Sequence, residues 1–258
     1  MLLADTFNRY FEPENLLAAH AVLSAAGYRV IEPTPAGARP LCCGRTFLAA
    51  GLVDEARREA RRLIDACLPH AERGTAIVGL EPSCLLGLRD EIPVMLPGAA
   101  AQTLADRAML FEEFLAAEAD AGHLSLALRA TPGKALLHGH CHQKAFDAMG
   151  AVETVLRLVP GLEVKTVQSS CCGMAGAFGY QAETYEVSMK MAELSLAPAV
   201  RAAPEDALIV ADGTSCRQQI EHATGREALH VRASARRHGW ACAGRSPGRD
   251  ARRGCAPS

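Results

Sequence analysis

Four cysteines in the second half of the chain have the residue type and the placement to bind a metal centre together. Cys141 follows an apolar run that predicts a strand. The pair Cys171-Cys172 follows a second such run, and Cys216 follows a third. Because parallel strands end at the same edge of a sheet, we expect the four thiols to converge there. Thiolates are the ligands of iron–sulfur clusters, typically four per cluster, so this set predicts an iron–sulfur cluster, which we expect to be 4Fe–4S.

Other side chains near Cys141 could assist such a centre. They are His138, His140, His142 and Lys144. If the preceding strand continues through them, the imidazoles all face one side, opposite Cys141. There they could tune a cluster, shuttle protons or cover it, and Lys144 could donate a hydrogen bond. A structural zinc site is the alternative, although zinc ligands usually lie roughly two to four residues apart and here two cysteines are adjacent.

The first half of the chain repeats the cysteine pattern. The motif Cys42-Cys43-Gly44 matches Cys171-Cys172-Gly173, and the later Cys84 matches Cys216, with offsets of 129 and 132 positions. Such a duplication predicts two pseudo-symmetric repeats. The first set has no cysteine where Cys141 would be mirrored, and Asp5 lies in that region. The candidate second site therefore comprises Cys42, Cys43, Cys84 and Asp5, and we expect it to be degenerate because iron–sulfide chemistry favours thiolate.

Apolar runs of strand length alternate with helical segments along most of the sequence. The alternation predicts an α/β fold with two repeats, each built on a mainly parallel sheet. We assign residues 1–125 to the first repeat, 126–231 to the second, and 232–258 to a disordered tail rich in Arg, Gly, Ser and Pro. The predicted helices cover 13–27, 53–68, 104–121, 143–159, 180–196 and 216–223, and the predicted strands cover 29–32, 75–80, 134–138, 162–167 and 207–211.

The composition excludes several classes of protein. Adjacent cysteines rarely bridge each other, so the ten cysteines favour metal or redox chemistry over a disulfide scaffold. Without the tail the chain holds 20 basic and 28 acidic residues, which argues against nucleic-acid binding. No stretch approaches the roughly 20 apolar residues of a spanning helix. The first residues do not form a secretory signal, so we expect a cytoplasmic protein that contacts the inner face of the cell membrane only through a partner.

Four stretches of the sequence together resemble the cysteine-rich CCG domain family. They are residues 5–13, 41–45, 138–145 and 171–176. That family includes the B subunit of heterodisulfide reductase, the iron–sulfur subunit of glycolate oxidase and the C subunit of anaerobic glycerol-3-phosphate dehydrogenase. The chain looks most similar to the C-terminal part of FAD-linked 2-hydroxy-acid dehydrogenases, such as D-lactate dehydrogenases. It departs from heterodisulfide reductase, whose repeats end in Cys-x-x-Cys where this chain has Cys84 and Cys216 alone.

The resemblance implies an iron–sulfur electron-transfer module of a flavin-dependent 2-hydroxy-acid dehydrogenase of the lactate or glycolate type. FAD is expected on a partner chain, because no Gly-x-Gly-x-x-Gly follows a strand here. A ferredoxin-like iron–sulfur protein is a second expected partner. Electrons would pass from the flavin to a quinone or another acceptor, and the chain alone would be inactive. A heterodisulfide or thiol–disulfide reductase subunit, and a zinc-stabilised scaffold without redox activity, remain as alternatives.

Overall fold

Two three-stranded parallel sheets form the framework of residues 1–231, which are the residues that the computed structural model describes. The first sheet has the order β1-β2-β3, with strands Leu2–Leu3, Ile77–Gly79 and Ala108–Leu110. The second has the order β5-β4-β6, with strands Leu162–Thr166, Gly133–Leu137 and Leu208–Val210. The predicted α/β class with parallel sheets is confirmed. The tail predicted for 232–258 lies outside the described residues.

Helices fill the connections between the strands. In the first repeat they are α1 (Thr6–Tyr10), α2 (Pro13–Ala25), α3 (Arg45–Ala49), α4 (Val53–Ala71), α5 (Pro82–Leu85), the 3-10 helix η1 (Leu86–Leu88), α6 (Glu91–Met95), α7 (Ala99–Arg107) and α8 (Phe111–Asp120). In the second they are α9 (Cys141–Ala145), α10 (Met149–Arg157), the 3-10 helix η2 (Phe178–Tyr180), α11 (Tyr185–Glu193), α12 (Leu196–Ala202) and α13 (Thr214–Thr224). Within residues 1–231, no helix combines the length and apolar character that crossing a membrane requires.

The two repeats share one strand order, which extends beyond the named strands. In the first repeat, the backbone N–H of Leu2 donates to the carbonyl of Ile31 at 2.8 Å, so the segment around Ile31 lies beside β1 as β5 lies beside β4. In the second repeat, Leu229 forms a parallel bridge to Val210 and lies beside β6 as β3 lies beside β2. The duplication that the cysteine spacing predicted is therefore confirmed in the topology.

One predicted helix is wrong, because the segment 104–121 contains a strand. Helix α7 ends at Arg107, the residues Ala108–Leu110 join the edge of the first sheet, and α8 begins at Phe111. The side chain of Glu113 accepts a hydrogen bond from the backbone N–H of Leu110 at 2.8 Å and so caps α8. Three apolar residues fit a helical or a strand pattern equally well, so periodicity alone could not show the break.

Other predicted boundaries also shift. The strand predicted over 29–32 is not formed, and only the single bond to Ile31 marks its place. The helix predicted over 143–159 divides into α9 and α10, separated by a turn in which Asp147 has a φ of 54°. The helix predicted over 180–196 is shorter, because η2 and a turn precede α11. In both helical cases a local turn interrupts the segment that the periodicity joined.

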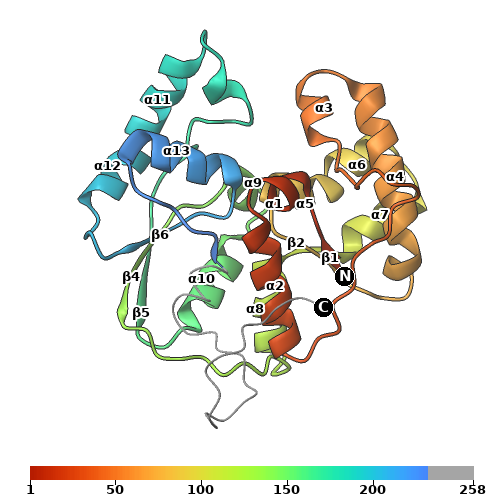
Figure 1. Cartoon of the computed structure of the whole chain (residues 1–258), viewed down its shortest axis with the longest axis horizontal. Helices are drawn as coiled ribbons and strands as arrows, with labels where there is room; N and C mark the ends of the chain where they lie inside the picture. Colours follow the sequence, from red (N-terminus) through yellow and green to blue (C-terminus); the bar gives the residue numbers. More distant parts are fainter. Residues whose placement is uncertain (232–258) are drawn as a thin grey trace.

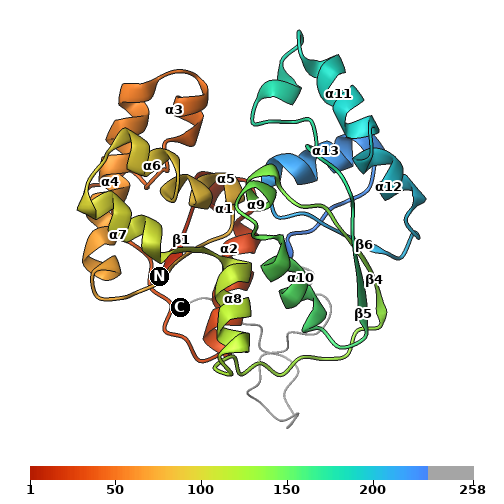
Figure 2. The ribbon, with the colours of Figure 1, turned by 180° about the vertical axis from the view of Figure 1, so that it is seen from behind.

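Apolar side chains from both repeats pack into a common cluster. It contains Leu2 and Val78 from the first sheet and Leu137 and Val210 from the second. Figures 1 and 2 show α2, α8 and α10 between the two sheets, and α8 packs directly against α10. The two repeats therefore do not fold as separate bodies but complete each other's core.

The carboxyl ends of the strands meet between the two halves of the molecule. Helix α1 begins three residues after β1, and α5, α9 and α13 begin three or four residues after β2, β4 and β6. In Figures 1 and 2, α1, α5 and α9 lie together at this position, and α5 contacts α9. This edge is where the predicted cysteine sites belong.

Candidate metal centre

The structure brings together the four cysteines singled out in the second repeat. Cys141 is the first residue of α9, Cys171 and Cys172 lie in the loop after β5, and Cys216 lies in the first turn of α13. The thiol of Cys141 is in hydrogen-bonding contact with Cys171, Cys171 with Cys172, and Cys172 with Cys216. The four sulfur atoms thus form one continuous chain of contacts, although they come from three separate segments.

Hydrogen bonding along this chain gives two of the thiols a lowered pKa and the other two a raised pKa. Hydrogen bonds from Cys141 and Cys172 lower the pKa of Cys171. The hydrogen bond from Cys172 lowers the pKa of Cys216, and the imidazoles of His140 and His138 lower it further. Conversely, hydrogen bonding to these sulfurs, together with burial, raises the pKa of Cys141 and Cys172. A metal centre would replace the shared protons, because cysteine binds metals as thiolate.

The loop after β5 is shaped to face the sulfurs with backbone N–H groups. The N–H of Gly173 donates to the Sγ of Cys171 at 3.3 Å, and the N–H of Met174 bonds to Cys172. Gly173 has a φ of 95°, and a Cβ there would meet the carbonyl oxygen of Ser188 at 2.3 Å. Only glycine fits at this position. Such N–H groups stabilise thiolates and the negative charge of a metal–thiolate centre.

The histidines do not alternate along a strand as predicted, because β4 ends at Leu137. His138 is buried, its Nδ1 bonds to the Oγ of Ser169 at 2.9 Å, and a ring nitrogen lies within 4.8 Å of Cys172 and Cys216. Among the described residues its Nε2 has no hydrogen-bond partner. His138 therefore faces the sulfurs directly.

His140 and His142 instead stack on each other at the start of α9. Their ring centroids are 5.1 Å apart, with an interplanar angle of 17°. The Nδ1 of His140 accepts the backbone N–H of His142 at 3.2 Å and caps the helix that begins with Cys141. Burial, together with the neighbouring His140 and Arg45, lowers the pKa of His142 to about 4. His142 thus lies close enough to Arg45 and Asp90 of the first repeat to be affected by their charges.

Lys144 anchors the cysteine loop by bonding to its backbone. Its Nζ donates to the carbonyl oxygens of Ser169 at 2.5 Å and Ser170 at 2.7 Å. Burial lowers the pKa of Lys144, whereas the thiols, Cys141 foremost, act to raise it. The ammonium therefore brings a positive charge close to all four sulfurs while it holds the residues just before Cys171.

The donor set of the second repeat fits a soft metal or an iron–sulfur cluster. It offers four thiols linked in one chain of contacts, backbone N–H groups on two of them, and a buried imidazole nitrogen of His138 close to two of the sulfurs. Sulfur ligands select zinc, copper(I) and iron–sulfur clusters over hard cations. A smaller group within this set, His138, Cys172 and Cys216, is also compact enough to hold a single zinc ion.

The first repeat brings three thiols together in the same way. Cys42 contacts Cys43, and Cys43 contacts Cys84. The N–H of Gly44 donates to the Sγ of Cys42 at 3.4 Å, which repeats the bond of Gly173 to Cys171. Gly44 has a φ of 82°, and a Cβ there would meet the carbonyl oxygen of Ala56 at 2.8 Å. The two Cys-Cys-Gly loops are therefore built alike.

Asp5 and Thr6 stand where the first repeat lacks a fourth cysteine. The Oδ1 of Asp5 accepts the N–H groups of Phe7 at 2.9 Å and Asn8 at 3.0 Å, and its Oδ2 accepts from the Nδ2 of Asn8 at 2.7 Å. Burial and the nearby Glu81 raise the pKa of Asp5 to about 6. The hydroxyl of Thr6 lies 3.6 Å from the Sγ of Cys42. A metal at Asp5 would have to compete with three hydrogen bonds that cap α1.

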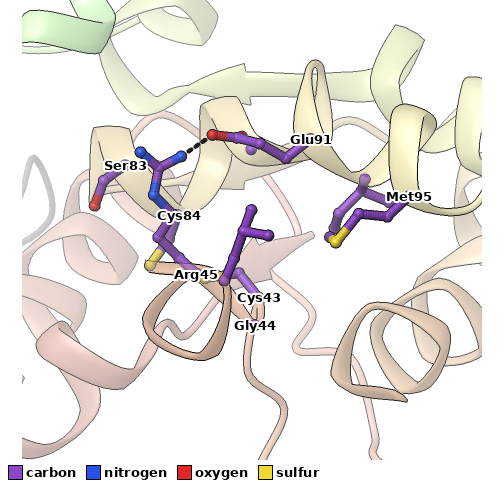
Figure 3. A pocket seen from close by; sticks show the side chains of 10 residues that line it. Cys43, Gly44, Arg45, Ser83, Cys84, Glu91 and Met95 are labelled. Atoms are coloured by element: carbon purple, nitrogen blue, oxygen red, sulfur yellow. Dashed lines mark hydrogen bonds and ion pairs between the residues drawn. The ribbon is translucent and has the colours of Figure 1, made fainter. Parts of the chain in front are cut away.

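A small pocket opens beside the first cysteine site. Figure 3 shows Cys43, Gly44 and Cys84 on its wall, with Arg45 reaching across it to form an ion pair with Glu91. The ion pair belongs to the first repeat alone. Sequence patterns gave no indication of this pocket, because Arg45 and Glu91 are far apart along the chain.

The cysteine outside both sites is part of the core. Cys67 on α4 is fully buried among apolar residues that include Leu3 and Leu63. Burial raises its pKa to about 12, so it stays a neutral thiol. Cys242 and Cys255 lie outside the described residues.

Three residues that form contacts between the repeats were not predicted from the sequence: Glu12, Glu81 and Arg217. The one available signal was the position of Glu81, directly after the apolar run that contains β2.

Two Cys-Cys-Gly loops on duplicated parallel α/β units define a class of protein. The model of the family described as "Cysteine-rich domain" (CCG) matches residues 6–89 and 135–221, so the chain belongs to this family. The match covers both repeats and includes every cysteine placed in the two sites. The resemblance noted from the sequence motifs is confirmed.

Curated relatives carry the names of dehydrogenases and of a lactate utilization protein. The C subunit of the anaerobic glycerol-3-phosphate dehydrogenase of Escherichia coli is 31% identical over 192 residues, which cover 73% of this chain and 47% of the relative. The D-2-hydroxyglutarate dehydrogenase of Pseudomonas putida is 31% identical over 234 residues, covering 89% of this chain and 21% of the relative. Lactate utilization protein A of Bacillus velezensis is 28% identical over 165 residues, covering 60% of this chain and 61% of the relative. The chain thus spans about half of the first relative and about a fifth of the second.

Proposed function

We propose that this chain is an iron–sulfur electron-transfer module, with a cluster bound by Cys141, Cys171, Cys172 and Cys216. The observation that carries the proposal is the unbroken contact chain of these four thiols at one edge of the second sheet. A bound cluster would accept and release single electrons, and the protein would set its potential. The N–H groups of the loop, the imidazole of His138 and the ammonium of Lys144 are the charge-compensating groups of this site.

The dehydrogenase type is a further part of the proposal. Two relatives are named as dehydrogenases or a dehydrogenase subunit, and a third for lactate utilization. A 2-hydroxy acid of the lactate, glycolate or 2-hydroxyglutarate kind fits two of these names. Flavin on a partner chain, or on another part of a longer protein, would oxidise the acid. The cysteine site would then relay electrons, with or without a ferredoxin-like protein, towards a quinone or another acceptor.

The three thiols of the first repeat form a candidate second site. Cys42, Cys43 and Cys84 repeat the contact order of the second repeat, and the carboxylate of Asp5 lies close enough to Cys84 to raise its pKa. Soft centres prefer thiolate, and the carboxylate of Asp5 already caps α1. We therefore assign the principal cluster to the second repeat and weaker or partial metal binding to the first.

Anaerobic reconstitution with iron and sulfide tests the principal proposal. The expected result is stoichiometric iron and sulfide in wild type with an EPR signal after reduction, and loss of that signal in Cys171→Ser. Cys67→Ser is the matched control, because Cys67 is buried in the apolar core and belongs to neither cysteine site. Wild type that takes up no iron, or a Cys171→Ser variant that retains the full signal, would refute the cluster assignment.

A zinc-stabilised scaffold is the second candidate, and one observation favours it. The possible ligand atoms of His138, Cys172 and Cys216 all lie within 4.8 Å of one another, which a single zinc ion could satisfy with one more thiol. Metal analysis of protein purified without oxygen separates the two candidates. Zinc near one equivalent without iron supports the scaffold, whereas iron with acid-labile sulfide supports the cluster. His138→Ala should release zinc in the first case and retain iron in the second.

A further inference from the structure

The two helices that carry the later cysteines share one capping carboxylate. Glu81 is the N-cap residue of α5, and its Oε1 accepts from the N–H of Ser83 at 3.3 Å and from the Oγ of Ser83 at 2.7 Å. Its Oε2 accepts from the N–H of Thr214, the first residue of α13, at 2.9 Å. Cys84 and Cys216 are the third residues of these two helices. Glu81 is only 2% exposed, so water does not compete for the carboxylate.

Helix α13 cannot supply a capping side chain of its own. Its N-cap residue is Gly213, and a Cβ there would meet the Cδ2 of His140 at 2.3 Å. The packing of His140 therefore excludes serine, threonine, aspartate and asparagine, the residues that usually cap helices. The offset of 132 positions that relates Cys84 to Cys216 also relates Glu81 to Gly213. Glu81 of the first repeat therefore caps helix α13 of the second repeat, whose own N-cap position holds Gly213.

The length of the Glu81 side chain matters for this arrangement. Aspartate is favoured over glutamate at N-caps, because its shorter side chain reaches the N–H groups of its own helix. Glutamate has one more methylene group, which lets its carboxylate face α5 with one oxygen and α13 with the other. A second contact between the repeats reinforces the bridge: the Nε2 of His230 bonds to the carbonyl oxygen of Leu80 at 3.1 Å.

We propose that Glu81 is a positioning residue that couples the two cysteine sites, by fixing the first turns of α5 and α13 with a single carboxylate. The effect on a bound cluster rests on the proposed function, but the bridge itself does not. The charge of Glu81 also acts on both repeats. It lies close enough to Cys84 and Asp212 to disfavour further negative charge on each. Negative charge near an iron–sulfur cluster lowers its reduction potential.

Two substitutions separate the bridge from the charge. Glu81→Asp retains the charge and can still cap α5, but its carboxylate is too short to reach Thr214. Glu81→Gln retains the length and removes the charge. The matched control is Glu118→Gln, because Glu118 is also a hydrogen-bonded carboxylate of the first repeat, accepting from the hydroxyl of Tyr28 at 2.6 Å, on a helix without cysteine.

Hydrogen exchange of the metal-free protein tests the bridge without any cluster. We expect Glu81→Asp to increase amide exchange in the first turn of α13, which lies 133 residues away, while α5 stays protected. Glu118→Gln should leave both helices unchanged. If Glu81→Asp exchanges like wild type throughout α13, the carboxylate does not hold that helix and the proposal is overturned.

The potential of the reconstituted cluster tests the coupling. The midpoint potential of Glu81→Gln should shift to more positive values, and the EPR line shape of Glu81→Asp should broaden, while Glu118→Gln matches wild type in both. If both Glu81 variants bind the cluster but have the midpoint potential and the EPR line shape of wild type, the coupling is overturned. Wild type without iron would instead refute the cluster, and the exchange result would still decide the bridge.

Discussion

Thr6 occupies in the first repeat the position that Cys141 occupies in the second. Each is the first residue of the helix that follows the first strand of its repeat. Each also contacts the leading cysteine of its Cys-Cys-Gly loop, through a hydroxyl 3.6 Å from Cys42 in one case and a thiol against Cys171 in the other. The residue before each, Asp5 or His140, caps the helix through its side chain. The first site is therefore a complete scaffold with one ligand exchanged.

Restoring that ligand should restore the site. In Thr6→Cys, we expect the fourth thiol to contact Cys42 and to raise iron and sulfide binding above wild type after reconstitution. Measuring iron per chain in a Cys171→Ser background isolates the first site from the second. Thr103→Cys adds a thiol on α7 away from both sites and should leave the iron content unchanged. Equal iron in Thr6→Cys and this control would show that the first repeat lacks more than a ligand.

Because Gly213 packs closely against His140, adding a methyl group at position 213 should lower the unfolding free energy. Gly213→Ala places a Cβ against His140, and we expect a loss of about 1–3 kcal/mol of unfolding free energy. Gly150→Ala is the control, since a Cβ there meets nothing within 4 Å and alanine favours the helix. Denaturant unfolding measures both variants. The double variant Gly213→Ala/His140→Ala should recover part of the lost unfolding free energy. If Gly213→Ala alone unfolds like wild type, the His140 side chain moves aside without cost.

Breaking the ion pair between Arg217 and Glu12 should cost stability, because Arg217 is buried, Glu12 is only 17% exposed and the pair joins the repeats. Arg217 also donates to the carbonyl oxygens of Ala211 at 2.8 Å and Asp212 at 2.6 Å. Removing one partner of a buried pair leaves the other charge without compensation, so Arg217→Met should cost about 3–5 kcal/mol. The exposed pair of Arg57 with Asp54 provides the comparison, and Arg57→Met should change stability by less than about 1 kcal/mol. If Arg217→Met and Arg57→Met lose similar amounts of unfolding free energy, the pair of Arg217 with Glu12 is no more important than an exposed one.

Asp212 should make stability depend on pH in an unusual direction. Burial raises the pKa of this carboxyl group, and the charge of Glu81 adds to the shift. Hydrogen bonds from the Nε2 of Gln143 and the N–H of Val231, together with the charge of Arg217, only partly oppose it. His230 also faces it, with its Nδ1 at 3.4 Å. Because the folded state keeps the proton to higher pH than the unfolded chain, the unfolding free energy should fall as pH rises from the ordinary carboxyl pKa through the raised one.

Asp212→Asn removes this titration and should flatten the pH profile of stability. The measurement is denaturant unfolding at a series of pH values on the metal-free protein. Asp206→Asn, at an exposed position, should leave the wild-type slope intact. If the profiles of Asp212→Asn and wild type run parallel, another group causes the slope.

The sequence predicted the framework of this molecule better than its polar contacts. Alternating apolar runs and the doubled cysteine motif were sufficient for the parallel sheets, the repeats and the convergence of four thiols, because all of these follow from strand order. The strand Ala108–Leu110 escaped detection because three apolar residues carry no period. The orientation of the histidines was wrong because it depended on whether β4 stopped at Leu137 or continued.

The bridging role of Glu81 could not be read from the sequence, for a different reason. Its two partners, Ser83 and Thr214, are 2 and 133 residues away, and only the first distance leaves a local pattern. The second exists because the repeats face each other across their strand ends. Contacts of this kind follow from the packing of the whole molecule and become visible only in three dimensions.

The common core of the two repeats limits how a protein of this type can change during evolution. Leu2 and Val78 share one apolar cluster with Leu137 and Val210, so a half made alone would expose part of that cluster to water. The metal-ligand residues of one repeat can change, as Thr6 in place of a cysteine illustrates. That repeat is still needed, because it completes the apolar cluster that it shares with the other.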